Sequence, residues 1–163
     1  MAAEIGPLVR LHSNTRIVAG SPELVSRNGH LLVGFDAAAV ETVEFPYHLA
    51  LSYVTGNNAT GVLTMLAASA TSGNVRARVA FEYHAPGAFD FDADGFAADQ
   101  EVNASADSVS GESFTATWTL SNANMDGWAA GGKGRVRISR VGNDGTNDTM
   151  TGDAQFDHFE ITQ

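Results

Sequence analysis

The sequence predicts an all-β protein, an antiparallel β-sandwich or jelly roll with a short irregular N-terminal arm. Three observations support this fold class: short segments alternate apolar and polar residues, turn residues separate these segments, and no segment shows the 3.6-residue period of a long helix. The clearest alternation lies in Gly134–Val141, where Val136 and Ile138 share one face and Arg135 and Arg137 share the other. About eight or nine such strands are expected, as is typical of a sandwich.

Length and composition restrict the possible functions. The chain has 163 residues, enough for one domain, and carries a net charge of −10 with only nine Lys and Arg, which argues against a nucleic-acid partner. The absence of cysteine excludes disulfides and thiolate chemistry. No apolar run approaches the roughly 20 residues that cross a bilayer, and the N-terminus lacks the basic and apolar regions of a signal peptide. We therefore expect a protein made without export machinery that binds neither nucleic acid nor membrane.

The first 28 residues hold no strand or helix period for long. Short apolar pairs are interrupted by Pro7, Gly20 and Pro22. Two interpretations remain open: residues 1–28 form a loosely attached first strand, or they form an arm that docks onto a neighbouring subunit. Residues 29–163 are expected to form the sandwich.

The alternation from residue 29 onward predicts the strands of the sandwich in order. They are Leu31–Phe35, Thr42–Phe45, Tyr47–Val54, Gly61–Ala68, Val75–Tyr83, Glu101–Ala106, Ser113–Leu120, Gly134–Val141 and Ala154–Ile161. Pro46 separates the second strand from the third, because proline lacks the N–H that a ladder needs. In Val75–Tyr83 the even-numbered residues, Glu82 among them, are expected to face solvent. Between Asn122 and Gly131 the pattern allows one short helical turn.

Asp90–Glu101 fits the formula of an EF-hand calcium loop. Acidic residues stand at positions 1, 3 and 5, Gly95 at position 6 and Glu101 at position 12. An EF-hand needs a helix on each side, whereas the segment upstream reads as a strand. We favour an acidic surface loop and expect no metal there, although calcium binding stays open.

Two further sets of residues have metal-ligating chemistry. The acidic group Asp144, Asn147, Asp148 and Asp153 could hold a cation, but turns closed by the Asp and Asn side chains explain it more simply and are favoured. The histidines show no zinc-binding spacing. They are His12, His30, His48, His84 and His158. With no nucleophile elbow and no singled-out carboxylate pair, we expect no catalytic residue, no cofactor and no enzyme activity.

Aromatic residues raise the possibility of carbohydrate binding, because their faces stack on sugars. Trp118 and Tyr83 fall on apolar strand faces and are expected in the core, as is more common for such residues. Trp128, in a loop between Gly127 and Ala129, is the candidate that remains. The glycine-rich Gly131–Gly134 is not a phosphate loop, because it lacks the required order of residues and no helix follows.

From Val33 to Thr162 the sequence resembles a jelly-roll domain of tailed-bacteriophage virion proteins. The resemblance lies in the order of several segments. They are Gly34–Asp36, Glu41–Phe45, Ser72–Glu82, Asp92–Ala98, Met125–Gly131, Arg135–Arg140 and Asp148–Ala154, followed by a closing strand. Where Arg76 or Ala77 stands here, such proteins usually carry Trp, so the inner packing is expected to differ. Related sequences keep an Asp-x-Asp-x-Phe-Ala segment without the full calcium ligand set.

The resemblance implies a bacteriophage capsid decoration, or cement, protein. Such a protein would bind the major capsid protein on the virion surface as a homotrimer after assembly in the host cytoplasm, and repeated contacts would stabilise the shell by avidity. The alternative is a tail-fibre or head-fibre tip that binds a host glycan, in which Trp128 would contact sugar. A third hypothesis, a free carbohydrate-binding module or esterase-like enzyme, would need a secretion signal or an attached catalytic domain.

Four arginines lie on strand faces that are expected to be exposed. They are Arg76, Arg78, Arg135 and Arg137. They are natural partners for acidic surfaces of another subunit, and ordinary cross-strand charge pairs explain them equally well.

Overall fold

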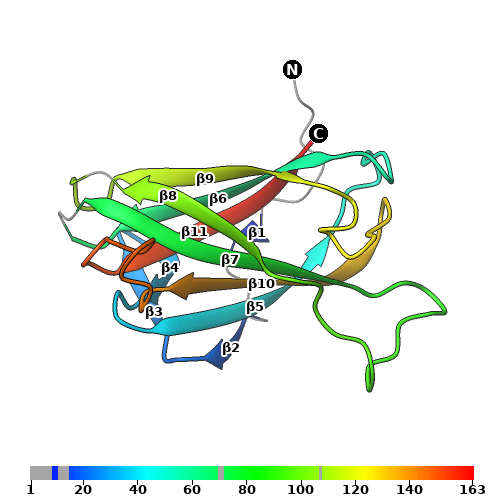
Figure 1. The fold of residues 1–163 in the computed structure, drawn as a ribbon, viewed down its shortest axis with the longest axis horizontal. Coiled ribbons are helices and arrows are strands. Elements are labelled where there is room, and N and C mark those ends of the chain that lie inside the picture. The colour runs from blue at the N-terminus through cyan, green and yellow to red at the C-terminus, as the bar shows by residue number, and fades with distance from the viewer. Residues whose placement is uncertain (1–8, 11–14, 70–71, 107) are drawn as a thin grey trace.

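The computed structural model describes residues 9–10, 15–69, 72–106 and 108–163, and over these ranges the chain forms a sandwich of two antiparallel sheets (Figure 1). This confirms the predicted all-β jelly-roll class. The strands are β1 Val9–Arg10, β2 Arg16–Ala19, β3 Glu23–Arg27, β4 His30–Phe35, β5 Val40–His48, β6 Ala59–Ala67, β7 Gly73–Tyr83, β8 Gln100–Ala106, β9 Ser113–Leu120, β10 Lys133–Val141 and β11 Ala154–Thr162. Within the described ranges no helix is long and apolar enough to cross a membrane.

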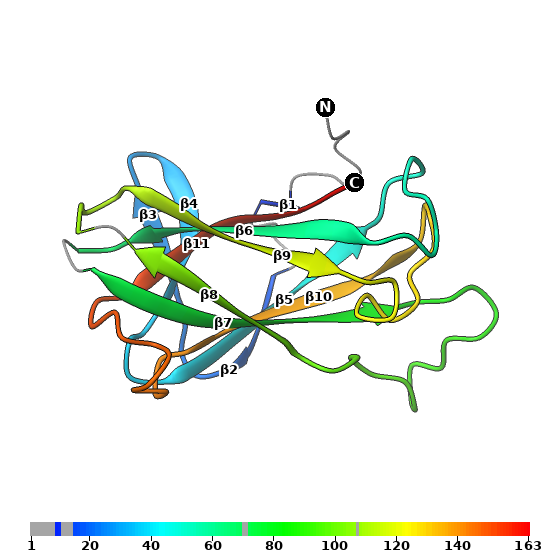
Figure 2. The ribbon, with the colours of Figure 1, turned by 45° about the horizontal axis from the view of Figure 1, so that its top comes forward.

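The two sheets contain interleaved parts of the chain. One sheet has the order β3-β4-β11-β6-β9, with β1 paired to β11, and the other has the order β2-β5-β10-β7-β8. Most connections therefore cross from one sheet to the other, and the loops gather at the two ends of the sandwich (Figures 1 and 2). The strands β10 and β11, which are neighbours in sequence, lie in different sheets.

The N-terminal segment contributes strands to the described fold. Of residues 1–28, residues 1–8 and 11–14 lie outside the described ranges. Among the others, β2 pairs with β5 in one sheet and β3 pairs with β4 in the other, so the segment joins both sheets. Ile17 and Val18 of β2 remain exposed.

The boundaries predicted around Pro46 are wrong. The strand β5 runs through Pro46, which pairs with Arg135 of β10, and the predicted strand Tyr47–Val54 ends at His48. On the other side of β5, β2 pairs only with Thr42–Glu44. Among the described residues no strand pairs with Pro46 on this side of β5, so its missing N–H breaks no described ladder.

A bulge in β11 decides which of its residues enter the core. The register with β6 shifts between Phe156 and His158. Because of this shift Phe156 and Phe159, an odd number of residues apart, are both buried. Phe156 stacks on Phe45 with ring centroids 5.9 Å apart, and Phe159 contacts Tyr47 and Phe81 at 5.8 and 5.9 Å.

Arg140 is a buried cation that fastens the β10–β11 loop. Its side chain is 1% exposed and donates to both carboxylate oxygens of Asp148 at 2.8 and 3.0 Å. The remaining donors reach the carbonyl oxygens of Phe35, Met150 and Gly152. Full hydrogen bonding compensates for burying the charge, so this arginine has a structural role.

Candidate functional site

Three loops meet at one end of the sandwich, which we call the loop end. They are the β5–β6 loop (residues 49–58), the β7–β8 loop (residues 84–99) and the β9–β10 loop (residues 121–132). Backbone hydrogen bonds join the first to the third, with Leu49 N donating to Gly132 O at 2.9 Å. Asp126 of the third loop accepts a hydrogen bond from the backbone N–H of Tyr83, the last residue of β7 before the second loop. The β7–β8 loop protrudes furthest from the sheets in both views (Figures 1 and 2).

The β7–β8 loop carries a cluster of aromatic rings, His84, Phe89 and Phe91, which we call the ring cluster. The His84 ring stacks on Phe89 with centroids 4.2 Å apart, and Phe91 meets both rings edge-on at 5.2 and 4.8 Å. Phe91 is nevertheless 80% exposed. Leaving so large an apolar side chain in water costs about 1.5–3 kcal/mol compared with burying it. Exposed aromatic surface of this kind marks binding sites.

The tip of the loop is closed by its own acidic residues. Asp90 N donates to Asp94 Oδ2 and Asp94 N donates to Asp90 O, each at 2.8 Å, while Asp92 N donates to Asp90 Oδ1. These bonds fix the backbone that presents Phe89 and Phe91. A surface that is already ordered loses less conformational entropy when a ligand binds.

The ring cluster is anchored to a buried carboxylate. His84 Nε2 lies 3.0 Å from Glu82 Oε2, and Glu82, expected to face solvent, is only 1% exposed. Arg135 contacts both carboxylate oxygens of Glu82 and also reaches Glu44. Burial raises the pKa of Glu82, but the hydrogen bonds from Arg135 and His84 outweigh it and hold that pKa below its usual value. The expectation of a solvent-facing Glu82 is therefore wrong, because these partners cover it.

A pocket of about 230 Å³ lies beside the ring cluster. Its wall combines aromatic and acidic side chains. They are Tyr83, Ala85, Ala88, Phe89, Asp94, Gly95 and Asp126. This volume is below the roughly 300–1,000 Å³ of pockets for drug-sized ligands. The pocket can hold one or two small rings.

The second half of the β7–β8 loop folds back over the outer face of the β5-β10-β7 sheet. Phe96 lies over the guanidinium groups of Arg135 and Arg137, 5.0 and 4.5 Å from ring centroid to Cζ. Asp99 accepts from Arg137 at 3.0 Å. These contacts cover the sheet face, so the accessible aromatic surface of this loop lies at its tip.

Trp128 does not contact solvent, so its prediction as a sugar-contacting residue is wrong. It is 0% exposed and packs against Tyr47, Phe81 and Tyr83 with ring centroids 5.9–6.2 Å apart. The glycine-rich stretch makes the necessary space. A Cβ at Gly132 would lie 2.5 Å from Trp128 Cδ1, and one at Gly134 would meet both the indole and the backbone of Glu82.

The other two aromatic residues singled out by sequence differ from Trp128 in exposure. Trp118, expected in the core, is half-buried and packs on Gly61 and Phe159. Tyr83, expected in the core, is half-buried and stacks on Trp128.

The acidic motifs are engaged in hydrogen bonds and ion pairs. Glu101, the last position of the calcium formula, lies on β8 and pairs with Arg76 and Arg78. In the second acidic group, Asp144 accepts from the backbone of Thr146 and Asn147, as a side-chain turn does. Asn147 and two backbone N–H groups, helped by Arg76, lower the pKa of Asp144 to about 2.

The four arginines expected on exposed faces are all paired within the chain. Arg76 contacts Glu101 and Asp144, and Arg78 contacts Glu101. Arg135 and Arg137 contact the carboxylates described above. Their geometry is that of cross-strand charge pairs, and it leaves these cations less available to an acidic partner.

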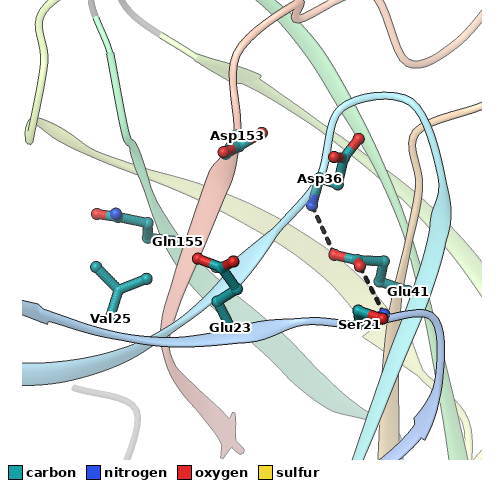
Figure 3. A pocket seen from close by; sticks show the side chains of 8 residues that line it. Ser21, Glu23, Val25, Asp36, Glu41, Asp153 and Gln155 are labelled. Carbon is teal, nitrogen blue, oxygen red and sulfur yellow. Dashed lines mark hydrogen bonds between the residues drawn. The ribbon is translucent and has the colours of Figure 1, made fainter.

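A separate acidic pocket of about 270 Å³ lies at the end of the sandwich opposite the loop end. Figure 3 shows four carboxylates around it, those of Glu23, Asp36, Glu41 and Asp153. Glu41 is buried and accepts from Ser21 N at 2.9 Å and Asp36 N at 2.7 Å, which joins two neighbouring turns. Over the part of the chain that the structure describes, no three Asp, Glu or His side chains lie close enough together to hold a metal ion.

The histidines lie in different parts of the fold. His12 is outside the described residues, and His84 belongs to the ring cluster. His48 Nε2 lies 2.8 Å from Gly131 O, and His158 Nδ1 lies 2.8 Å from the Asp157 carboxylate. Of the residues considered from sequence, His84, Tyr83 and the acidic β7–β8 loop belong to the candidate site. Phe89 and Phe91 were missed, although two phenylalanines in an otherwise acidic loop are a usable signal.

Solved structures share this fold, among them two carbohydrate-binding modules. The carbohydrate-binding module CsCBM6-3 from Clostridium stercorarium, in complex with cellobiose, matches with a TM-score of 0.51 and 12% identity over 97% of this chain and 94% of that one. The family 11 carbohydrate-binding module from Clostridium thermocellum, in complex with a β-1,3-1,4-mixed-linked tetrasaccharide, matches with a TM-score of 0.50 and 10% identity over 98% and 96%. At such identities the likeness shows the jelly-roll fold alone. No protein-family model and no curated protein matches the chain.

Proposed function

We propose that this protein is a non-catalytic carbohydrate-binding protein and that the ring cluster, with the pocket beside it, is its sugar-binding site. The exposure of Phe91 within a closed loop is the observation that carries the proposal. A pyranose ring has an apolar C–H face that stacks on aromatic rings and hydroxyl groups that hydrogen-bond to polar side chains. Phe89 and Phe91 supply the first interaction, and Asp94 and Asp126 supply the second.

The fold supports the same proposal. The two carbohydrate-binding modules reported above were solved with cellobiose and with a β-1,3-1,4-linked tetrasaccharide. We extend this chemistry to the present chain as a proposal, so short β-linked oligosaccharides are the natural first probes. Since a shared fold hosts many functions, the site itself carries more of the argument.

The absence of catalysis is part of the proposal. Catalytic carboxylates in sugar hydrolysis work as a pair in which one donates a proton. The buried carboxylate that contacts the ring cluster, Glu82, is engaged by Arg135. Burial raises the pKa of Glu82, but the hydrogen bonds from Arg135 and His84 outweigh it and hold that pKa below its usual value, so Glu82 is a poor proton donor.

Titration calorimetry with short β-linked oligosaccharides tests the proposal. Phe91→Ala and Phe89→Ala should each weaken binding about tenfold, since a ring stacked on a ligand contributes on the order of 1 kcal/mol. Leu51→Ala is the matched control, because Leu51 is 84% exposed and apolar on another loop of the same end. Equal effects of the two kinds of substitution, or no binding of any sugar by the unaltered protein, would contradict the proposal.

Decoration of a bacteriophage capsid stays a prediction from the sequence resemblance. The two structural matches give it no support and agree better with the glycan-binding alternative. The exposed Ile17 and Val18 on the short edge strand β2 are the surface that a docking N-terminal segment would offer. Light scattering for a trimer, combined with co-sedimentation with capsids, would decide between the two.

A further inference from the structure

We infer that the ring-cluster site selects sugars by charge: it binds amino sugars most tightly, neutral sugars less tightly, and rejects sugars that carry carboxylate or sulfate groups. This inference rests on the proposed function and concerns the same site. It follows from three properties of the site. The pocket has carboxylate oxygens that accept no hydrogen bond from the described residues, the neighbouring cations are engaged by other carboxylates, and the aromatic faces attract positive charge.

The pocket offers carboxylate oxygens that are not used by the protein. Asp94 Oδ2 accepts from Asp90 N at 2.8 Å, and Asp126 Oδ2 accepts from Tyr83 N at 2.9 Å. Among the described residues no donor reaches Oδ1 of either side chain. These bonds hold each carboxylate in place while one oxygen remains available for an N–H or O–H of a ligand. A protonated amine makes the stronger bond, because charge-assisted hydrogen bonds to carboxylates exceed neutral ones.

The pocket offers no compensating positive charge to an anionic sugar. Its lining contains no Lys, Arg or His. The arginines on the neighbouring sheet face, Arg135 and Arg137, are held by Glu82, Glu44 and Asp99. The net charge of −10 adds a general repulsion of anions. His84 of the ring cluster likewise has its Nε2 3.0 Å from Glu82. A uronic acid or sulfated sugar would therefore meet two carboxylates, while the neighbouring cationic groups are engaged by carboxylates of the protein.

The rings favour the same order of ligands. Aromatic faces attract cations through their quadrupoles, and the effect grows where water is partly excluded. Phe89 lines the pocket together with Asp94, and Phe91 contacts Phe89 edge-on. An ammonium group beside the pyranose ring would meet a phenyl ring and a carboxylate together, whereas a neutral hydroxyl gains only the hydrogen bond.

The test uses three oligosaccharides of equal length in calorimetry at pH 6 and low salt. They are an oligomer of N-acetylglucosamine, its deacetylated form and an oligomer of a uronic acid. We expect the deacetylated form to bind about five- to tenfold more tightly than the acetylated form, as two partly exposed charge pairs allow. The uronic acid should show no measurable binding. The preference for the amine should shrink as salt is raised, because salt screens exposed charges.

Two double variants separate the pocket from the overall charge. Asp94→Asn with Asp126→Asn should reduce the preference for the amine over the acetylated oligomer to within about twofold, because the charge of both acceptors is removed while their hydrogen-bonding capacity is kept. Glu23→Gln with Asp153→Asn removes the same net charge from the acidic pocket at the opposite end. This control should keep the full preference.

The outcomes distinguish this inference from the proposed function. Equal or tighter binding of the uronic acid overturns charge selection but leaves sugar binding intact. An equal loss of preference in both double variants assigns the effect to overall charge and overturns the role of the pocket. If the protein binds none of these three oligosaccharides and none of the neutral β-linked oligosaccharides, the proposed function itself is overturned.

Discussion

Two aromatic clusters adjoin at the loop end, and their exposure is opposite. Trp128 with Tyr47 and Phe81 is buried, whereas the ring cluster is open to solvent, and the two meet at the consecutive residues Tyr83 and His84. In each cluster an aromatic residue of a loop packs at the end of β7: Trp128 stacks on Tyr83, and Phe89 stacks on His84. The difference is the backbone around them. Gly132 and Gly134 let the indole lie against β10, whereas the β7–β8 loop extends beyond the end of the sheets before it returns to β8 (Figure 2). An aromatic loop residue thus becomes core or binding surface according to the space its neighbours leave.

Trp128→Ala should have the largest effect on stability. Removing a fully buried indole loses its transfer free energy and leaves a cavity, so the free energy of unfolding should fall by about 3–5 kcal/mol. Urea denaturation monitored by circular dichroism measures this change. A loss below about 1 kcal/mol would show that the indole is not the packing centre of the buried cluster.

Gly132→Ala should destabilise the same buried cluster by overpacking it, whereas Trp128→Ala leaves a cavity. The added methyl group would lie 2.5 Å from Trp128 Cδ1 and 2.6 Å from Tyr83 Cε2, and overpacking of this kind costs about 1–3 kcal/mol. Gly145→Ala is the control, since a Cβ there has nothing within 4 Å. Equal unfolding midpoints of the two variants would contradict this packing.

The Glu82 carboxylate, which is bound by Arg135 and His84, predicts that the free energy of unfolding depends on pH. Because the pKa of Glu82 is lower in the folded protein than its usual value, its ionised form stabilises the fold. This contribution is complete above the unfolded pKa, about 4.3, and is lost as pH falls through the lower folded value. We therefore expect the unfolding free energy to drop from pH 6 to pH 3 by more in the unaltered protein than in Glu82→Gln. If the free energies of unfolding of the two proteins change with pH in parallel, the ionised Glu82 does not stabilise the fold.

Asp144, far from both clusters, provides a reference for that pH experiment. Its pKa of about 2 means that its contribution is lost between about pH 4 and pH 2, a range more acidic than its usual value near 3.9. Asp144→Asn should flatten the profile in this range and leave sugar binding at neutral pH unchanged. A change in sugar affinity would show that the β10–β11 loop reaches the site.

Phe91→Ala should have the smallest effect on folding. Surface substitutions away from packing features usually change stability by less than about 0.5 kcal/mol, so the unfolding midpoint should hardly move while sugar binding weakens. These two results together would show that Phe91 contributes to binding and not to stability, whereas Trp128 contributes to stability. A large loss of stability would instead place Phe91 in a supporting role for the loop.

Much of the fold could be predicted from the sequence, and the exceptions have physical causes. Alternation located the strands Val75–Tyr83 and Ser113–Leu120 closely, because one face of each packs on the core and the other meets polar surroundings. It failed at Pro46, because among the described residues β2 pairs with Thr42–Glu44 and does not extend to Pro46. It also failed at Glu82, which Arg135 and His84 cover. The local alternation of residues cannot predict how far a neighbouring strand extends or which path a loop takes.

The candidate site was less predictable than the fold. Sequence reasoning chose Trp128 because it lies in a loop, but its exposure depends on the glycines beneath the indole and on the aromatic residues of two strands, β5 and β7. It passed over Phe89 and Phe91 because the acidic residues around them drew attention to calcium. The resemblance to virion proteins agreed with the jelly-roll fold, while the capsid partner and the homotrimer remain predictions.

By itself the sequence determined the all-β class, the positions of most strands and the acidic character of the chain, since these depend on side-chain period and composition. Tertiary structure decided the rest. It placed β10 and β11 in different sheets, used a bulge to turn both Phe156 and Phe159 inward, buried Trp128 and left Phe91 exposed. The physical reason is that burial is set by contacts between residues distant in sequence, and only the assembled sandwich brings those residues together.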